Sequence, residues 1–493
     1  MSYIIGIDIG TTNTKAVAFT DEGEVLATAG ESYSAISDSD GRHELDPARL
    51  LEAFVSVLKE VAGKTAHRKG LAGISLSCAM HSLIVVDKEG VPLTNAITWA
   101  DLRSQPYAAA LKSSEAGKRI YRQTGTPIHP MSPLSKLLWL KDKEPVIFQQ
   151  AAKFISIKEY LWWRLFGKYQ VDYSIVSATG LFDIYAFTWY GESLEKAGIT
   201  ADHLSVPVPC THRESSLMPA FSLLLGLPEG LPFIIGSSDG CLANLGSRAL
   251  LPGETTLTIG TSGAVRMTAA APEFDPRERI FNYILTEKLY ISGGATNNGG
   301  GVVQWYIEQF LDKKGAGSKE LSDWVATADT VAPGSEGLIF LPYLQGERAP
   351  IWNADAKGVF FGIRSSHEQR HFMRALLEGI SYSLFQVGTS LEETIGPIQH
   401  IYASGGFTHS KAWLQMVADI FSKRVYVTGV ADASAIGAAI IGFYALGIIG
   451  DLEDSAGLIQ VRETYEPDEQ RHRIYQERVS LFATLYERLR DLM

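Results

Sequence analysis

The chain of 493 residues has little of several features that mark large classes of protein. It contains three cysteines, Cys78, Cys210 and Cys241, which are odd in number and widely separated, so the sequence predicts neither a disulfide framework nor a zinc site. Positive charge is also scarce, and the net charge of −11 argues against a nucleic-acid or anionic-membrane partner. An anionic substrate stays possible, because a cleft can be locally basic.

Long hydrophobic runs are missing as well. The nearest candidate for a membrane span, residues 435–449, is too short and is rich in Ala and Gly, which is typical of a tightly packed buried helix. The chain enters a strand at Tyr3 with no basic region or cleavage site before it, so we expect no secretory signal. The sequence therefore predicts a protein of the reducing cytoplasm.

Three familiar motifs are absent. Residues 63–65 read Gly-Lys-Thr, like the end of a P-loop, but the glycine required five positions earlier is Leu58. There is no GxGxxG dinucleotide fingerprint and no HExxH zinc motif. These absences argue against a P-loop kinase and against a dehydrogenase.

A short phrase that does occur twice is Ile-Gly-Thr followed by Thr or Ser, at residues 9–12 and 259–262. Each copy ends a strand-like run, turns on Gly-Thr and returns as a second strand-like run. Such a turn points backbone N–H groups and hydroxyls at one spot, which suits phosphate oxygens. Two such cradles on two half-chains predict a cleft that grips a polyphosphate from both sides, as in an ATP-dependent phosphotransferase.

The chain is too long for one core, so two domains are expected, and residues 245–252 are the best candidate boundary. Strand-like and helical runs alternate in both halves, which indicates an α/β fold with mixed sheets covered by helices. In the first half we expect strands at residues 3–9, 14–20, 25–30, 71–77, 83–87 and 231–236, a helix at 46–66, and a helical cap within 104–190 that includes a helix at 157–166. In the second half we expect strands at 255–259, 264–268, 280–285, 289–292 and 401–403, and helices after residue 297 and at 368–391, 411–422 and 468–493.

Two aspartates are candidates for the chemistry. Asp8 lies on the strand that leads into the first cradle, where a carboxylate needs a cation between itself and phosphate, so we interpret it as a Mg²⁺ site; it could instead cap the turn. Asp239 follows an apolar strand and precedes a helix, a position where α/β proteins bind ligands. There it can accept a hydroxyl proton during phosphoryl transfer, or act as the N-cap of the helix. Lys15 adds positive charge near the first cradle, unless it is merely solvated.

Further candidates fall into two sets. Gly299–Gly301 and Gly405-Gly406 precede predicted helices, where backbone can approach a flat ligand, although each could be a plain turn; Gln304 lies one turn beyond. A polar and aromatic set is expected of a sugar pocket. Two of its members could have purely structural roles instead: the histidine could be hydrogen-bonded at the end of a strand, and the arginine could form an ion pair at the surface. The set is Met80, His81, Trp99, Asp101 and Arg103.

Together these segments resemble the FGGY carbohydrate kinases, of the actin-like ATPase superfamily, over nearly the whole chain. The resemblance implies two actin-like (ribonuclease H-like) domains, at residues 1–247 and 248–493, that close on ATP and a sugar. The segments that carry it are 8–12 and 259–263 for the phosphate motifs, 341–350 for a family loop, 358–363 and 375–379 for the C-terminal signature, and 405–406, Trp413 and 418–420 for the adenosine segment.

The resemblance also implies roles for particular residues. Asp239 would be the general base, with Mg²⁺ near Asp8, and a homodimer is an expected assembly because dimers are common in the family. The phosphate contacts would be Gly10, Thr11, Thr12, Gly260 and Thr261; the nucleotide site would include Gly300, Gln304, Gly405, Gly406 and Ser410; and Met80, His81, Trp99 and Asp239 would meet the sugar.

The expected substrate is D-gluconate, converted to 6-phosphogluconate, because residues 97–104, 124–134 and 347–353 look most like the gluconate kinases of the family. Its carboxylate needs a cation, for which Arg103, His129, His81 and Lys15 are candidates. Xylulose kinases share the Met80-His81 pair but usually have Gly where this chain has Ser82, and glycerol kinases carry Arg-Glu at positions 80 and 81. A xylulose kinase forming xylulose 5-phosphate, or an actin-like nucleotide switch with no sugar turnover, are the rival hypotheses.

Overall fold

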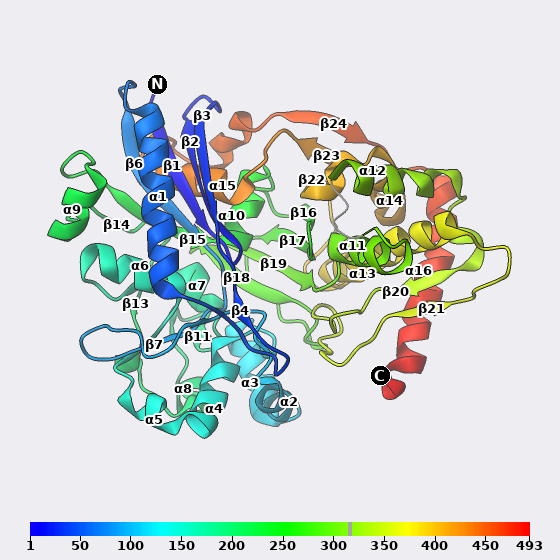
Figure 1. Ribbon diagram of the computed structural model, residues 1–493, viewed down its shortest axis with the longest axis horizontal. Helices are drawn as coiled ribbons and strands as arrows, with labels where there is room; N and C mark the ends of the chain where they lie inside the picture. The colour runs from blue at the N-terminus through cyan, green and yellow to red at the C-terminus, as the bar shows by residue number, and fades with distance from the viewer. Residues whose placement is uncertain (314–317) are drawn as a thin grey trace.

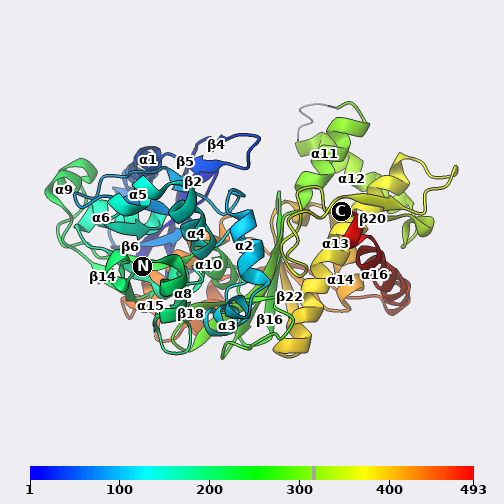
Figure 2. The ribbon, with the colours of Figure 1, turned by 90° about the horizontal axis from the view of Figure 1, so that it is seen from below.

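The structure, a computed structural model, describes residues 1–313 and 318–493. Two α/β lobes lie side by side, each built on a mixed β-sheet flanked by helices (Figures 1 and 2). The first lobe carries the blue and cyan segments at the left of Figure 1, and the second lobe carries the yellow and most of the red segments at the right.

The first lobe is organised around a six-stranded sheet in the order β14-β15-β6-β1-β2-β3. β1 pairs in parallel with β6 and antiparallel with β2, and β15 extends the parallel part beyond β6. β1 is buried along almost its whole length, which explains why its sequence is apolar on both faces. The strands are β1 (Tyr3–Ile9), β2 (Asn13–Thr20), β3 (Val25–Ser32), β6 (Leu71–Cys78), β14 (Arg213–Glu214) and β15 (Phe233–Ser238).

Helix α1 (Pro47–Thr65) covers this sheet and begins where the sequence predicts. Asp46 is its N-cap and accepts a hydrogen bond from the Ala48 N–H at 2.9 Å. Pro47 occupies the first helical position, where no N–H is needed. The buried face of α1 packs against β1, β2 and β3 and closes the core of the first lobe.

Residues between the main strands form the predicted helical cap, at the lower left of Figure 1. The strand predicted at residues 83–87 belongs to this cap rather than to the main sheet, because β7 (Ile84–Val86) pairs only with β9 (Lys153–Ile155). A short apolar run fits any buried strand, so its pattern could not identify its partner. The other cap and edge elements are β4 (Ile36–Ser37), β5 (His43–Leu45), β8 (Ala96–Ile97), α2 (Gln105–Lys112), α3 (Glu115–Thr124), α4 (Pro133–Lys143), α5 (Pro145–Gln150), α6 (Ile157–Phe166), β10 (Gln170–Asp172), α7 (Tyr173–Ser177), β11 (Phe182–Asp183), β12 (Thr188–Trp189), α8 (Gly191–Ala197), β13 (Val206–Val208) and α9 (Pro219–Leu225).

The second lobe contains a seven-stranded sheet in the order β18-β19-β17-β16-β22-β23-β24. β16 and β17 form the antiparallel hairpin that carries the second Ile-Gly-Thr phrase, and β22 lies parallel to β16 on its other side. This arrangement repeats that of β1, β2 and β6 in the first lobe. The strands are β16 (Glu254–Ile259), β17 (Gly263–Ala269), β18 (Phe281–Thr286), β19 (Leu289–Thr296), β22 (His400–Ser404), β23 (Val425–Thr428) and β24 (Val461–Tyr465), with β20 (Ile339–Leu341) and β21 (Val359–Phe361) paired separately.

The helices of the second lobe lie close to their predicted positions. The longest, α13, is buried along most of its length and packs between the sheet and the outer helices. Within residues 1–313 and 318–493, no helix has both the length and the apolar character needed to cross a membrane. The helices are α11 (Gly300–Phe310), α12 (Ser318–Thr327), α13 (Gln369–Thr394), α14 (Lys411–Phe421) and α16 (Glu469–Leu489).

Two helices tie the lobes together. α15 (Ala433–Ala445) comes from the second half of the chain, yet it packs on α10 (Asp239–Gly246) and on β1 and β6 of the first sheet (Figure 1). Glycines allow this close approach: a Cβ on Gly6 would lie 1.9 Å from the Ala435 carbonyl oxygen, and one on Gly437 would lie 2.1 Å from that of Leu242. We infer that the two domains divide in sequence near residues 247 and 248, with α15 returning to the first lobe.

The contact between α10 and α15 predicts that an alanine substitution on α15 lowers the stability of the protein more than one in the segment that follows α15. Gly437→Ala should destabilise the protein by about 1–3 kcal/mol, because its Cβ meets backbone that cannot move without separating the helices. Gly457→Ala, where nothing lies within 4 Å of the added Cβ, is the matched control and should be nearly neutral. Urea unfolding of both variants measures the difference, and equal stabilities would contradict the proposed tight packing.

Candidate functional site

A cavity of about 290 Å³ receives residues from both lobes. The first lobe contributes the first Gly-Thr turn, Asp239 and part of the predicted sugar pocket, and the second lobe contributes the second turn and the inner face of its sheet. The lining residues are Thr11, Met80, His81, Trp99, Met131, Asp239, Thr258, Gly260, Ser262, Gly263, Ala264, Arg266, Phe281, Tyr283, Ala295, Arg348 and Trp352.

The two Gly-Thr turns have the predicted strand-turn-strand form. In the first, the Gly10 N–H donates to the Asn13 carbonyl at 2.9 Å, and in the second, the Gly260 N–H donates to the Ser262 carbonyl at 2.9 Å. Thr11 from the first turn and Gly260 from the second reach the same cavity. Of the remaining predicted phosphate contacts, Thr12 is exposed beside Thr11, and Thr261 is exposed beside Gly260.

The predicted nucleotide residues gather around the second turn. The Gly300 N–H donates to the Gly260 carbonyl at 2.7 Å, so helix α11 begins directly against the turn. Gly405 has a positive φ of 93°, and a Cβ there would lie 2.4 Å from the Ile259 carbonyl oxygen, so only glycine fits. Gly406 follows it and is exposed, two residues after the end of β22.

Two side chains of the nucleotide set already have partners within the protein. Ser410 is the N-cap of α14 and accepts from the Trp413 N–H at 3.2 Å. The Gln304 amide donates to Glu308 at 2.9 Å on the exposed face of α11. Gln304 lies on α11, which starts against the second turn, and Ser410 lies directly before α14, so they stay candidates by position rather than by a free polar group.

Asp8 lies at the end of β1, where its carboxylate accepts a hydrogen bond from the Ser77 hydroxyl at 2.6 Å. Burial, and then the charge of Asp239, raise the pKa of Asp8 to about 7. Lys15 does not neutralise it by contact, because its ammonium group pairs with Asp432 at 2.6 Å. Lys15 therefore bridges β2 to the start of α15 rather than pointing freely at the first turn.

Asp8 and Asp239, two half-buried carboxylates that repel each other, offer the hard oxygen donors that Mg²⁺ prefers. The described parts of the chain hold no group of three or more His, Cys, Asp or Glu side chains arranged for a metal. A magnesium ion at Asp8 would thus take its other ligands from water and phosphate oxygens, as Mg²⁺ commonly does. The residues present fit such an ion.

Asp239 is placed by an irregularity at the end of β15. Gly236 has a φ of 66°, and the pairing of β15 with β6 shifts register between Ile234 and Ser237. The following Ser238 caps α10, accepting from the Cys241 N–H at 3.4 Å. The alternative that Asp239 is the N-cap is therefore wrong: Asp239 is the first residue of the helix, and its carboxylate lines the cavity.

The environment of Asp239 makes it a stronger base than an exposed aspartate. Burial raises its pKa, against the opposing effect of the nearby Arg266 guanidinium. Its Oδ1 also accepts from the Gly240 N–H at 2.8 Å, which fixes the direction of the carboxylate. A half-buried, oriented carboxylate with a raised pKa suits proton abstraction from a hydroxyl group.

Met80, His81 and Trp99 line the cavity as predicted. His81 Nδ1 lies 2.8 Å from the Ala178 carbonyl, and its Nε2 lies 3.3 Å from the Tyr283 hydroxyl. Burial, helped by the charge of Lys136, lowers the pKa of His81 to about 3. His81 is thus a neutral wall residue with both ring nitrogens engaged.

His129 lies behind this wall and is not among the residues that line the cavity. Its Nδ1 accepts from the Met131 N–H at 3.2 Å, and its ring packs on Trp352 with centroids 5.5 Å apart. Its Nε2 is buried without a partner among the described residues. Burial, and then the charge of Arg348, lower its pKa well below the ordinary histidine value, so it is a neutral donor and not a cation.

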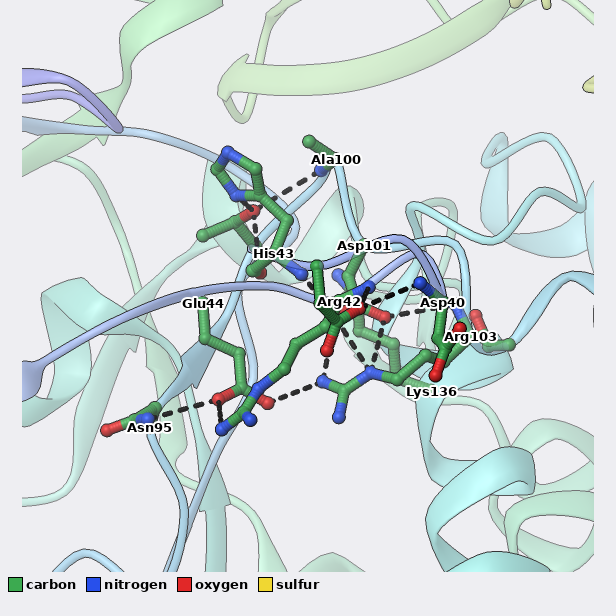
Figure 3. Close-up of polar contacts among 12 residues, drawn as sticks. Asp40, Arg42, His43, Glu44, Asn95, Ala100, Asp101, Arg103 and Lys136 are labelled. Atoms are coloured by element: carbon green, nitrogen blue, oxygen red, sulfur yellow. Dashed lines mark hydrogen bonds and ion pairs between the residues drawn. The ribbon is translucent and has the colours of Figure 1, made fainter. Parts of the chain in front are cut away.

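The prediction that Arg103 meets the substrate needs correction. Figure 3 shows its guanidinium held by carboxylates: Nη2 lies 2.5 Å from Glu44 and 2.7 Å from Asp101. Arg103 also lies over the Trp139 ring, 4.4 Å from its centroid, and it lines a different cavity. Asp101, two residues after the cavity residue Trp99, belongs to this same ion-pair cluster, and its carboxylate also accepts from the His43 N–H.

Several residues that line the cavity had no role assigned from the sequence, and among them are Arg266, Tyr283, Arg348 and Trp352. Arg266 is a lone charge inside the otherwise apolar strand β17, a signal that marks a polar environment on one face. Arg348 and Trp352 lie within the segment at residues 347–353 that resembles gluconate kinases, but neither was given a contact. Tyr283 carries no sequence signal that separates it from core aromatics.

Comparison with known proteins agrees with this geometry. The model of the FGGY family of carbohydrate kinases, N-terminal domain, matches residues 3–246, and the model of the C-terminal domain of the same family matches residues 255–446. The chain is 41% identical over 496 residues to a gluconokinase from Bacillus licheniformis, covering 99% of this chain and 96% of that protein.

Solved structures also resemble the chain over nearly its whole length. The crystal structure of gluconate kinase from Lactobacillus acidophilus has a TM-score of 0.94 and 34% identity, covering 99% of this chain and 98% of that one. A ligand-bound xylulose kinase from the same organism has a TM-score of 0.93 and 34% identity, with the same coverage. These matches confirm the predicted family resemblance and the two-domain α/β fold.

The corrected position of Arg103 leads to a prediction. Arg103→Met should lower the free energy of unfolding by about 2 kcal/mol, because Glu44 and Asp101 lose a charged hydrogen-bond partner. It should leave the KM of the substrate unchanged. Denaturant unfolding and steady-state kinetics on the same preparation test both statements; normal stability with a raised KM would restore Arg103 to the substrate site.

Proposed function

The chain belongs to the FGGY family of carbohydrate kinases, and we propose that it phosphorylates D-gluconate at its terminal hydroxyl, with ATP as donor, to give 6-phosphogluconate. The protein is a kinase that transfers phosphate to a sugar hydroxyl, as the family model and the gluconokinase relative both indicate. The choice of gluconate rests on the 41% identity to that relative and on the cations of the cavity.

The observation that carries the proposal is the position of Asp239. Its half-buried carboxylate lies in one cavity with Thr11 of the first turn and Gly260 of the second. A hydroxyl group bound there can give its proton to Asp239 while its oxygen attacks a phosphoryl group held between the turns. The acceptor would lie against Met80, His81 and Trp99, on the side of the cavity away from the turns.

The nucleotide would lie along the second lobe. The turn residues Gly10, Thr11, Thr12, Gly260 and Thr261 would hold its phosphates, and Gly300, Gly405 and Gly406 would allow the adenosine to approach the backbone. Gln304 lies on α11, and Ser410 lies directly before α14. Mg²⁺, held through Asp8, would neutralise phosphate charge; Lys15 would act at longer range, since Asp432 holds its ammonium group.

Two alternatives differ in what the cavity must do. A xylulose kinase would use the same base and turns, and the equally similar xylulose kinase structure keeps this possibility open. An actin-like nucleotide switch would need no acceptor pocket, and the polar and aromatic wall beside Asp239 disfavours it. A homodimer and a cytoplasmic location stay predictions.

The proposal is tested by ADP release with Mg·ATP in the presence of gluconate, xylulose, ribulose, glycerol or no sugar. We expect stimulation by gluconate far above every other arm, with the product carrying phosphate on its terminal hydroxyl. A preference for xylulose would refute the choice of substrate while keeping the mechanism. Release that ignores every sugar would refute the kinase proposal itself and support the switch.

Asp239→Asn tests the base. Turnover should fall by about 10²–10⁴-fold, because the amide cannot accept the proton, while ATP binding measured by calorimetry should be retained. Asp432→Asn is a useful comparison, since that carboxylate pairs with Lys15 outside the cavity and should affect turnover far less. Near-normal turnover of Asp239→Asn would exclude Asp239 as the base.

A further inference from the structure

In the structure, none of the four cations predicted to bind a substrate carboxylate is free to do so. Lys15 is paired with Asp432, and Arg103 is paired with Glu44 and Asp101 outside the cavity. His81 and His129 are held neutral by burial. The cations that do line the cavity are the two arginines that the sequence analysis missed, Arg266 and Arg348.

Arg266 lies near Asp239 without pairing with it. Within the described parts of the chain, its guanidinium makes no ion pair and no hydrogen bond, and its Nε is buried without an acceptor. It lies against the start of α10, since a Cβ on Gly240 would lie 3.1 Å from this Nε. The charge of Asp239 offsets part of the cost of burying Arg266, but the donors of the guanidinium stay unsatisfied, so they suit an anion from outside the chain.

Arg348 is only partly satisfied. It is 8% exposed, its Nη2 donates to the Thr296 carbonyl at 2.9 Å, and its guanidinium lies 4.7 Å from the centroid of the Trp99 ring. Its Nε has no partner in the described residues. The neighbouring carboxylate, Glu347, accepts instead from backbone N–H groups at Asn297 and Arg348 and from the side chain of Asn298.

The positions of the two arginines indicate which anion they bind. Arg348 contacts Trp99, and its charge acts on His81 and His129, so it lies on the acceptor side of the cavity. Asp239 repels a carboxylate, which favours binding of a sugar acid with its hydroxyl end at Asp239 and its acid end at the guanidinium groups. Arg266 acts electrostatically on both Asp239 and Arg348, so it lies close enough to bind the same carboxylate as Arg348.

We propose that Arg266 and Arg348 together form the carboxylate subsite of the acceptor pocket and select sugar acids over neutral sugars. Guanidinium groups suit this task because they present paired donors to a carboxylate and stay charged when desolvated. The inference rests on the proposed function, since it names the groups that recognise the acid end of the same acceptor.

The test compares gluconate with glucitol, a neutral polyol of the same chain length in which the carboxylate is replaced by a hydroxymethyl group. Binding is followed without ATP through tryptophan fluorescence, since Trp99 and Trp352 line the cavity. The wild-type protein should bind gluconate more tightly than glucitol, by about tenfold or more. Equal affinities would overturn the inference, whatever the enzyme phosphorylates.

Arg266→Gln is the cleaner variant for binding, because Arg266 makes no hydrogen bond or ion pair in the described structure; its effect on turnover also includes the loss of its charge near Asp239. The KM and dissociation constant of gluconate should rise about ten- to hundredfold, glucitol binding should not change, and the KM of ATP should stay as in the wild type. Arg348→Lys provides a second variant that keeps the charge and loses the paired donors, and it should weaken gluconate binding less. Arg424→Gln, exposed beside Glu466, is the matched control and should behave as the wild type.

The outcomes separate this inference from the proposed function. If the wild-type protein phosphorylates gluconate but Arg266→Gln and Arg348→Lys keep its KM, the inference is overturned and the function stands. If both variants lower kcat and leave the binding of gluconate unchanged, the arginines act on Asp239 or on the transferred phosphoryl group, which also overturns the inference. If gluconate never stimulates ADP release in the wild-type protein, the proposed function fails independently of the variants.

Discussion

The central constraint on this protein is the partial burial of two carboxylates, Asp8 and Asp239, at the carboxyl ends of β1 and β15, the two parallel strands that flank β6. Burial raises the pKa of both groups, and the charge of Asp239 raises that of Asp8 further. Such groups are stable as anions only where cations or donors approach them. The arrangement of the cavity follows from this need: Arg266 approaches Asp239, Ser77 donates to Asp8, and the remaining charge suits a magnesium ion and a phosphate chain.

A buried ion pair and the packing of two helices hold the structure around these carboxylates in place. Lys158 and Asp172 form a fully buried ion pair of 2.7 Å, and Lys158 also donates to the Ser237 carbonyl at 2.8 Å, two residues before Asp239. The end of β15 is therefore fixed by a charge pair, and the start of α10 by its packing on α15. Because α15 belongs in sequence to the second half, the packing that supports the base also joins the lobes.

Much of this arrangement could be predicted from sequence because it depends on local signals. The repeated Ile-Gly-Thr phrase located both hairpins, Asp46-Pro47 located the start of α1, and the apolar run before Asp239 located β15. The partners of isolated charges could not be predicted in the same way. Arg103 follows the cavity residue Trp99 by four positions, yet Glu44, distant in sequence, draws it into another cluster. Arg266 was missed because its role depends on β17 facing Asp239 from the other lobe, and the sequence does not reveal that contact.

The most direct test of the account is the crystal structure of the protein with gluconate and a non-hydrolysable ATP analogue. The account predicts the terminal hydroxyl of gluconate within hydrogen-bond reach of the Asp239 carboxylate, the triphosphate between the turns at Gly10 and Gly260, and the gluconate carboxylate at Arg266 and Arg348. Gluconate bound in the reverse direction, or bound outside the cavity that contains Asp239, would contradict it.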